Sequence, residues 1–251
     1  MTTLFAQRAG QGPRVVLVHG AVLFGALTWR EQLALGERWE LTIVERAGYG
    51  RSRHVHDGED PEVDAPLVAE LLDGGAHLVG QSSGAVVAML AAAQRPEAVR
   101  SLTLSEPPAF QLAPDSPAAQ RMQHDLERLV EQTDADDATA LRRFVAIVGS
   151  NAQVGDDPPQ PLIDGVRALR AYGEGRPWTL ELPLAALAAA PFPKLVISGD
   201  HNPAFEAVCD ALAERLGAER AHVTGAKHTT PHAGAAFNER LETFLDAAER
   251  T

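Results

Sequence analysis

The pentapeptide Gly-Gln-Ser-Ser-Gly at residues 80–84 constrains the fold of this chain more than any other segment. It follows the apolar run 76–79 and precedes the alanine-rich stretch 85–93, which predicts a strand, a sharp turn and a helix. So tight a turn strains the backbone of the serine at its apex and leaves room only for glycine two positions to either side. The hydroxyl of Ser82 is therefore expected to stand clear of the backbone, beside the N-terminus of a helix.

The same alternation of short apolar runs and helical patterns extends along most of the chain. Strands are expected at residues 15–18, 41–44, 76–80, 101–104, 194–198 and 220–223. Helices are expected at residues 28–36, 63–72, 84–94, 204–216 and 237–249. A leading strand could come only from residues 2–8. Short buried strands that alternate with helices predict an α/β fold, with a mostly parallel central sheet and helices on both of its faces.

A long helical segment interrupts this alternation between the predicted strands 101–104 and 194–198. The stretches 117–132, 136–148 and 161–172 each show helical spacing of apolar residues. We therefore expect a core formed by residues 1–107 and 186–251, and a helical cap formed by residues 108–185. The cap leaves the sheet near Ser82, at the carboxyl edge where open α/β sheets bind ligands. Phe110 and Trp178, close to the two junctions of the cap, are candidate substrate-binding residues.

The composition excludes several classes of function. A net charge of −12 argues against binding to nucleic acid or to an anionic membrane, since both require a basic surface. A single cysteine, Cys209, rules out an internal disulfide and lies in a helical pattern, as a packed thiol would. Residues 1–10 lack the features of a signal peptide, and the apolar runs are too short to span a bilayer. We therefore expect a cytoplasmic monomer or homodimer that acts on a small molecule.

A serine hydroxyl needs a base that accepts its proton and a third group that orients the base. The best-placed base is His228, which follows the last predicted strand by a short loop and precedes the last predicted helix. His232 is an alternative, although it lies beyond Pro231 and nearer that helix.

Two carboxylates could orient this histidine. Asp200 follows the predicted strand 194–198, but the commoner spacing for the acid falls on Asn202, an amide that cannot balance an imidazolium charge. Glu106 ends the strand 101–104 and is followed by two prolines that stiffen the turn. The residues alone favour Glu106 as the acid and leave Asp200 as an alternative. If Asp200 is not the acid, it could cap the helix 204–216.

An oxyanion intermediate needs N–H donors that are already in place. The N–H of Ser83, at the start of a predicted helix, is one candidate. The second should come from the turn after His19-Gly20, from Ala21 or alternatively from Val22, and Val22 is also a candidate substrate contact. His54, His56 and Asp57 superficially suggest a metal site, but no further ligands complete it, so neither a metal nor a cofactor is expected.

Taken together, several segments resemble those of the α/β-hydrolase superfamily. They are His19-Gly20, the glycine-rich loop 48–52, the serine turn at Ser82, the cap and His228. The similarity runs from about residue 13 to the end of the chain. Paired serines at the turn, with Glu106 and a proline after the next strand, are similar to zearalenone lactonases and related lactone or ester hydrolases. That resemblance implies Glu106 as the acid.

The resemblance implies a serine hydrolase that cleaves a small, mostly apolar carboxylic ester or lactone through an acyl-enzyme. A serine at the turn disfavours dehalogenase and epoxide hydrolase activity, because those reactions need a carboxylate nucleophile. Two alternatives remain at this stage. One is a non-hydrolytic enzyme of the same fold, such as a lyase or a biosynthetic cyclase. The other is a ligand-binding protein with a vestigial triad.

Overall fold

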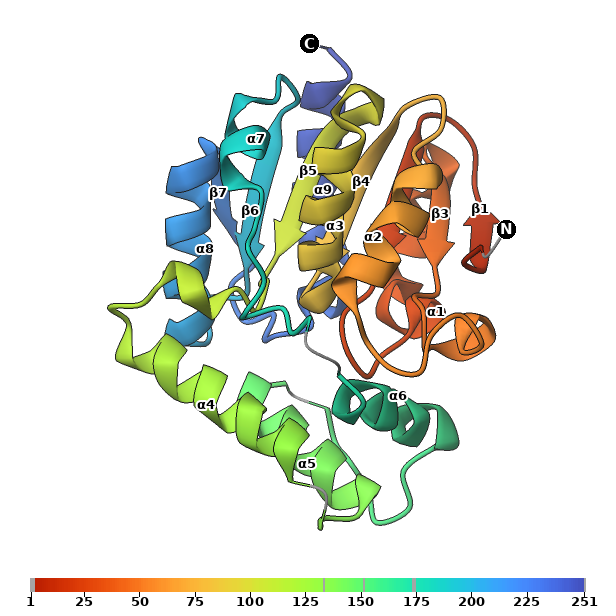
Figure 1. The fold of residues 1–251 in the computed structure, drawn as a ribbon. Coiled ribbons are helices and arrows are strands. Elements are labelled where there is room, and N and C mark those ends of the chain that lie inside the picture. The colour runs from red at the N-terminus through yellow and green to blue at the C-terminus, as the bar shows by residue number, and fades with distance from the viewer. Residues whose placement is uncertain (1–2, 133, 151, 173–174, 251) are drawn as a thin grey trace.

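The computed structural model describes residues 3–132, 134–150, 152–172 and 175–250. Within them, seven strands form one sheet in the order β1-β3-β2-β4-β5-β6-β7 (Figure 1). The strands are β1 Ala6–Ala9, β2 Arg14–Val18, β3 Glu40–Val44, β4 Ala76–Gln81, β5 Val99–Ser105, β6 Lys194–Ser198 and β7 Glu219–His222. Only β1 runs antiparallel to its neighbour, β3, and every other pair is parallel. The predicted α/β fold with a mostly parallel sheet is therefore confirmed.

Helices cover both faces of the sheet. The α-helices among the described residues are α1 Gly25–Thr28, α2 Pro61–Glu70, α3 Ser83–Gln94, α4 Pro117–Glu131, α5 Asp137–Val148, α6 Gln160–Arg170, α7 Leu184–Ala189, α8 Pro203–Leu216 and α9 Ala235–Ala248. Side chains alternate between the two faces of a strand. Accordingly, Val16 and Val18 of β2 join the apolar cluster that includes α2, α3 and α8. Val15 and Leu17 join the cluster that includes α9, which lies behind the sheet in Figure 1.

Three local details differ from the sequence prediction. Residues 28–36 are not one α-helix, because α1 ends at Thr28 and a 3₁₀ helix follows over Arg30–Glu37. Trp29 separates the two and is fully buried, with its ring 6.4 Å from that of Phe237 on α9, so tertiary packing overrides the local pattern here. The leading strand β1 extends slightly beyond residues 2–8. The short helix α7 was not predicted, and the expected cap boundary at residue 186 falls inside it.

The three cap helices α4, α5 and α6 lie together beyond the carboxyl ends of the strands (Figure 1). Side chains at their N-termini fix where two of them begin: Ser116 caps α4 and Asp136 caps α5. Helix α4 buries Met122, Leu126 and Leu129 in the same apolar cluster as α8, so the cap packs on the core. No helix among the described residues combines the length and apolarity that a membrane span requires.

Candidate active site

Ser82 lies at the sharp turn between β4 and α3, as the sequence predicts. Its backbone angles are φ 53° and ψ −129°, a conformation that side chains seldom adopt. Steric limits explain why glycine stands two positions to either side of Ser82. A Cβ on Gly84 would overlap the carbonyl oxygens of Val18 and His19, and a Cβ on Gly80 would overlap the backbone of Gly84. The backbone of β4 and β2 thus approaches the start of α3 closely enough to hold the serine in its strained conformation.

A chain of hydrogen bonds leads from this serine to a buried carboxylate. Nε2 of His228 lies 3.0 Å from Oγ of Ser82, and Nδ1 lies 2.8 Å from Oε2 of Glu106. His228 is 4% exposed and Glu106 is fully buried. A carboxylate can only accept, so Nδ1 of His228 carries the proton and Nε2 is free to accept one from Ser82.

Glu106 remains ionised despite its burial. Burial alone would raise the pKa of this carboxyl. The contact with His201, the hydrogen bond and charge of His228, and the N–H of Gly199 at 2.6 Å from Oε1 outweigh that effect and lower the pKa of Glu106 below its usual value. An ionised acid beside Nδ1 stabilises the imidazolium that forms when His228 accepts a proton.

The alternative acid and the alternative base lie elsewhere. Asp200 is exposed, and its backbone N–H donates to Oε1 of Glu206 at 3.1 Å. The cap of α8 is Asn202, which accepts the N–H of Ala204, so the alternative role of Asp200 as the cap of this helix is not observed either. His232 donates through Nε2 to the carbonyl of Leu27 at 3.0 Å. The structure therefore brings Glu106 and His228 to Ser82.

Two free backbone donors border the same site. Within the described residues, the N–H groups of Ala21 and Ser83 have no hydrogen-bond partner. The N–H of Val22, by contrast, donates to the hydroxyl of Tyr49 at 3.1 Å. Val22 adopts φ 69°, which is rare for a β-branched residue, so this contact secures a strained loop. Of the two expected alternatives, Ala21 is the one whose N–H is free.

A buried charged network beneath this loop was not anticipated from the sequence. Arg46 is fully buried and donates to Asp64 at 2.8 Å and to the hydroxyl of Ser83 at 2.9 Å. Glu59, 3.6 Å from the guanidinium, accepts the hydroxyls of Tyr49 in the core and Tyr172 in the cap. In the sequence, this network is signalled only by a charged residue, Arg46, two positions after a predicted buried strand.

His19 supports the loop as a neutral imidazole. Its Nδ1 donates to the carbonyl of Gly20 at 2.7 Å, and its Nε2 accepts the backbone N–H of Arg46 at 3.0 Å. Burial, assisted by the charge of Arg46, lowers the pKa of His19 to about 3. The side chain therefore stays uncharged at neutral pH and keeps both hydrogen bonds.

A mostly apolar cavity lies over Ser82, with about 560 Å³ of empty space, part of it open to solvent. The residues that line it are Ala21, Val22, Leu23, Gln81, Ser82, Leu141, Phe144, Val145, Val148, Ser150, Ala152, Gln153, Val154, Leu162, His228 and Thr229. Helix α5 thus contributes one wall, which the sequence analysis missed. Val22 lines the cavity, as expected. Phe110 and Trp178 do not: their rings pack 5.9 Å from those of Phe205 and Tyr172, respectively.

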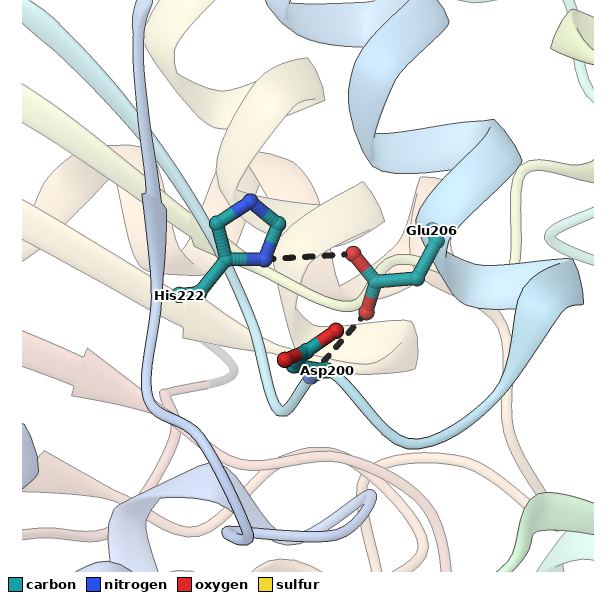
Figure 2. A group of neighbouring side chains, drawn as sticks. All are labelled: Asp200, Glu206 and His222. Carbon is teal, nitrogen blue, oxygen red and sulfur yellow. Dashed lines mark hydrogen bonds and ion pairs between the residues drawn. The ribbon is translucent and has the colours of Figure 1, made fainter.

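A second polar cluster lies beyond the ends of β6 and β7, where Asp200, Glu206 and His222 approach one another (Figure 2). Such a set could in principle bind a cation. However, Oε2 of Glu206 already accepts from Arg220 at 2.6 Å and from the hydroxyl of Ser198 at 2.7 Å. Its carboxylate is thus neutralised and satisfied by the protein, and we assign no metal to the cluster. His56, which superficially suggested a metal site in the sequence, lies outside this cluster and donates to the carbonyl of Gly58 at 3.2 Å.

A sharp serine turn after β4, a histidine after the last strand and helices beyond the carboxyl edge of the sheet are typical of α/β hydrolases. Residues 15–247 match the alpha/beta hydrolase family, and the chain belongs to it. A similar curated protein is the pimeloyl-[acyl-carrier protein] methyl ester esterase of Methylococcus capsulatus, 36% identical over 145 residues, or 57% of this chain and 56% of that one. The Chromobacterium violaceum protein of the same name is 32% identical over 69% of this chain and 66% of its own. The chain thus spans 56–66% of the length of these two relatives.

Solved structures share the fold. An alpha/beta hydrolase from Sphaerobacter thermophilus superposes with a TM-score of 0.69 at 24% identity and covers 96% of both chains. A thermophilic esterase from Thermogutta terrifontis gives a TM-score of 0.67 at 21% identity, over 98% of this chain and 93% of the other. At these identities the likeness concerns architecture alone.

Proposed function

We propose that this protein is a serine esterase that cleaves a small, mostly apolar carboxylic ester or lactone through an acyl-enzyme. The observation that carries the proposal is the continuous hydrogen-bonded path from Ser82 through His228 to Glu106, which opens onto an apolar cavity. The free N–H groups of Ala21 and Ser83 lie beside the same site, where they would stabilise the negative oxygen that forms during acyl transfer.

In the proposed reaction, Oγ of Ser82 attacks the carbonyl carbon while its proton passes to Nε2 of His228. The N–H groups of Ala21 and Ser83 stabilise the negative oxygen of the tetrahedral intermediate. The intermediate collapses as His228 protonates the departing alcohol oxygen, which leaves the acyl group esterified to Ser82. A water molecule then attacks the acyl carbon, gives one proton to His228 and releases the acid, and Ser82 recovers the proton. Glu106 stabilises the imidazolium at both stages.

The lining of the cavity and the relatives suggest which substrates to test. Leu141, Phe144, Val145 and Val148 present an apolar wall that suits an aliphatic or aromatic group rather than a charged one. The two curated relatives are named as methyl ester esterases. Methyl esters of apolar acids are therefore the first class to test, together with short p-nitrophenyl esters and simple lactones.

The experiment compares the parent protein with Ser82→Ala on p-nitrophenyl butyrate. We expect kcat to fall by about 10⁴-fold or more, because the variant has no nucleophile. A fluorophosphonate should label the parent stoichiometrically at Ser82 and leave the folded variant unlabelled. Hydrolysis by Ser82→Ala at the parent rate would exclude the mechanism. Failure of folded parent protein to react with the probe would favour a lyase, a cyclase or a ligand-binding role.

A further inference from the structure

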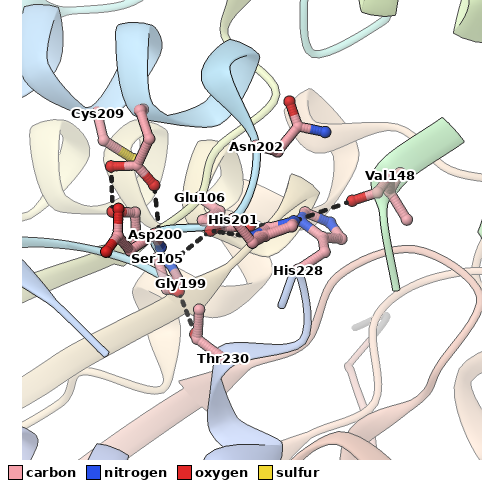
Figure 3. Close-up of polar contacts among 12 residues, drawn as sticks. Ser105, Glu106, Val148, Gly199, Asp200, His201, Asn202, Cys209, His228 and Thr230 are labelled. Carbon is pink, nitrogen blue, oxygen red and sulfur yellow. Dashed lines mark hydrogen bonds and ion pairs between the residues drawn. The ribbon is translucent and has the colours of Figure 1, made fainter. Parts of the chain in front are cut away.

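A second histidine, His201, contacts the oxygen of the buried carboxylate that His228 does not. His201 lies in the loop after β6, and its side chain is 4% exposed. Nδ1 of His201 is 3.4 Å from Oε1 of Glu106, and Nε2 is 3.3 Å from the carbonyl oxygen of Val148. Figure 3 shows this imidazole between the acid and the end of cap helix α5. The residue therefore touches the proposed triad and the cap at once.

Both neighbours of His201 can only accept hydrogen bonds. A neutral imidazole has one N–H donor and could satisfy one of them, whereas an imidazolium has two donors. Nδ1 forms no well-aligned hydrogen bond within the described residues, and its 3.4 Å contact with Oε1 of Glu106 becomes an ion pair when the ring is protonated. The arrangement of two acceptors around one ring thus fits the charged form of His201.

The groups around His201 on each packed element are consistent with a charge there. Glu106 follows β5, Lys227 and His228 lie on the loop after β7, and Asp200 is on the same loop as His201. Helix α5 contributes the carbonyl of Val148, and α8 contributes the ring of Phe205 at 6.3 Å. Burial and Lys227 lower the pKa of His201, but the contact with the charged Glu106 and the hydrogen bond to Val148 raise it more, and the net shift is upward.

The close approach is built into the backbone. Gly149, the residue after Val148, adopts φ 69°, and a Cβ there would lie 3.2 Å from the His201 ring, so a side chain at this position would be strained and would crowd the histidine. The side chain of Val148 lines the cavity over Ser82. The end of α5 therefore contacts His201 and also forms part of the cavity wall.

We propose that His201 is a positioning residue: its imidazolium holds the second oxygen of Glu106 and ties the triad acid to the end of α5. The inference rests on the proposed function, because it acts through Glu106. It has an electrostatic consequence, since His201 and protonated His228 compete for one carboxylate. Without the His201 charge, Glu106 pairs with protonated His228 alone and stabilises it more strongly.

The first test is the pH dependence of kcat/KM for His201→Gln, with p-nitrophenyl butyrate as substrate. Glutamine retains a donor for Val148 but carries no charge. We expect the acidic limb of the profile to move upward by about 0.5 to 1 pH unit. The control His124→Gln, at an exposed position on α4, should leave the limb in place. A merely structural role for His201 lowers activity at all pH values alike, so an unmoved limb would overturn the proposal.

The second test needs no turnover. In protein labelled with ¹⁵N at histidine, the His201 ring is assigned by the signal that His201→Gln lacks. In the parent protein we expect both ring nitrogens of His201 to stay protonated above pH 6.5, the ordinary pKa of histidine being about 6.5. In Glu106→Gln the ring should lose its second proton at a lower pH than in the parent. A His201 ring that is neutral at pH 6.5 would overturn the inference. A charged ring in a protein without esterase activity would instead count against the proposed function.

Discussion

Glu106 and His228 are 122 positions apart in the sequence, yet Oε2 of one lies 2.8 Å from Nδ1 of the other. They follow β5 and β7, which the sheet places on either side of β6. Side chains outside the proposed triad hold the histidine loop in place: Gln81 donates to the carbonyl of His228 at 3.1 Å, and the hydroxyls of Ser105 and Thr230 are hydrogen-bonded to each other. Glu106 and His228 are thus fixed relative to each other by the ends of two parallel strands that flank β6.

This relationship predicts which acid matters for turnover. In Glu106→Gln the amide cannot balance the imidazolium charge, and we expect kcat to fall by about 10³- to 10⁴-fold. Asp200→Asn serves as the matched control, because Asp200 is exposed and lies on the neighbouring strand end. It should change kcat less than about twofold. Steady-state kinetics on p-nitrophenyl butyrate distinguishes the two, and a larger loss in Asp200→Asn would refute the assignment.

The hydroxyl of Tyr49 should control the geometry of the proposed oxyanion site. It accepts the N–H of Val22 and donates to Glu59, and burial together with the Glu59 charge raises the pKa of Tyr49, so the hydroxyl stays protonated. Tyr49→Phe releases the strained loop that carries Ala21. We expect kcat to fall about tenfold with little change in KM, since the N–H of Ala21 is used mainly in the transition state.

Tyr172→Phe provides the comparison for this experiment. It removes the other hydroxyl that Glu59 accepts but leaves the Val22 contact intact. If kcat falls equally in both variants, the effect comes from the buried charge of Glu59 and not from the loop.

The neutral state of His19 predicts a loss of stability in acid. The pKa of His19 is about 3 in the folded protein and about 6.5 when the chain is unfolded. Between these values the unfolded chain binds more protons, so stability falls as the pH is lowered. This one group should contribute a slope of up to about 1.4 kcal/mol per pH unit below pH 6.5.

Urea unfolding at pH 7 and pH 5 measures this contribution. Glutamine cannot take up the proton, so His19→Gln lacks this part of the pH dependence. The stability difference between parent and variant should therefore shrink as the pH falls. A difference that stays constant between the two pH values would show that His19 is not the group responsible.

The sequence predicted those parts of the molecule that depend on local pattern. The strand, turn and helix at Ser82 follow from apolar runs and from glycines whose space is limited by the backbone itself. The cap helices were recognised from the spacing of their apolar residues, because each is amphipathic and packs on the core. Local rules suffice where the nearest neighbours along the chain decide the conformation.

Features that depend on distant contacts could not be obtained in this way. Glu106 and Asp200 both follow core strands, and only the fold decides which one reaches His228. Phe110 and Trp178 lie near the cap junctions, but their rings turn into aromatic clusters rather than the cavity. The contact of His201 with α5 joins residues 53 positions apart, and no spacing in the sequence signals it.

The wall of α5 predicts how substrate size is selected. Phe144 lines the cavity, and Phe144→Ala should make room for a longer acyl or alcohol group. Burial of each added methylene contributes about 0.8 kcal/mol, so the preference for p-nitrophenyl hexanoate over the acetate should rise by roughly fourfold per methylene that fits. Met122→Ala is the matched control, since it truncates a buried residue of the cap that does not line the cavity. The ratio of kcat/KM values should rise only in Phe144→Ala; an equal rise in both variants would indicate general loosening of the cap.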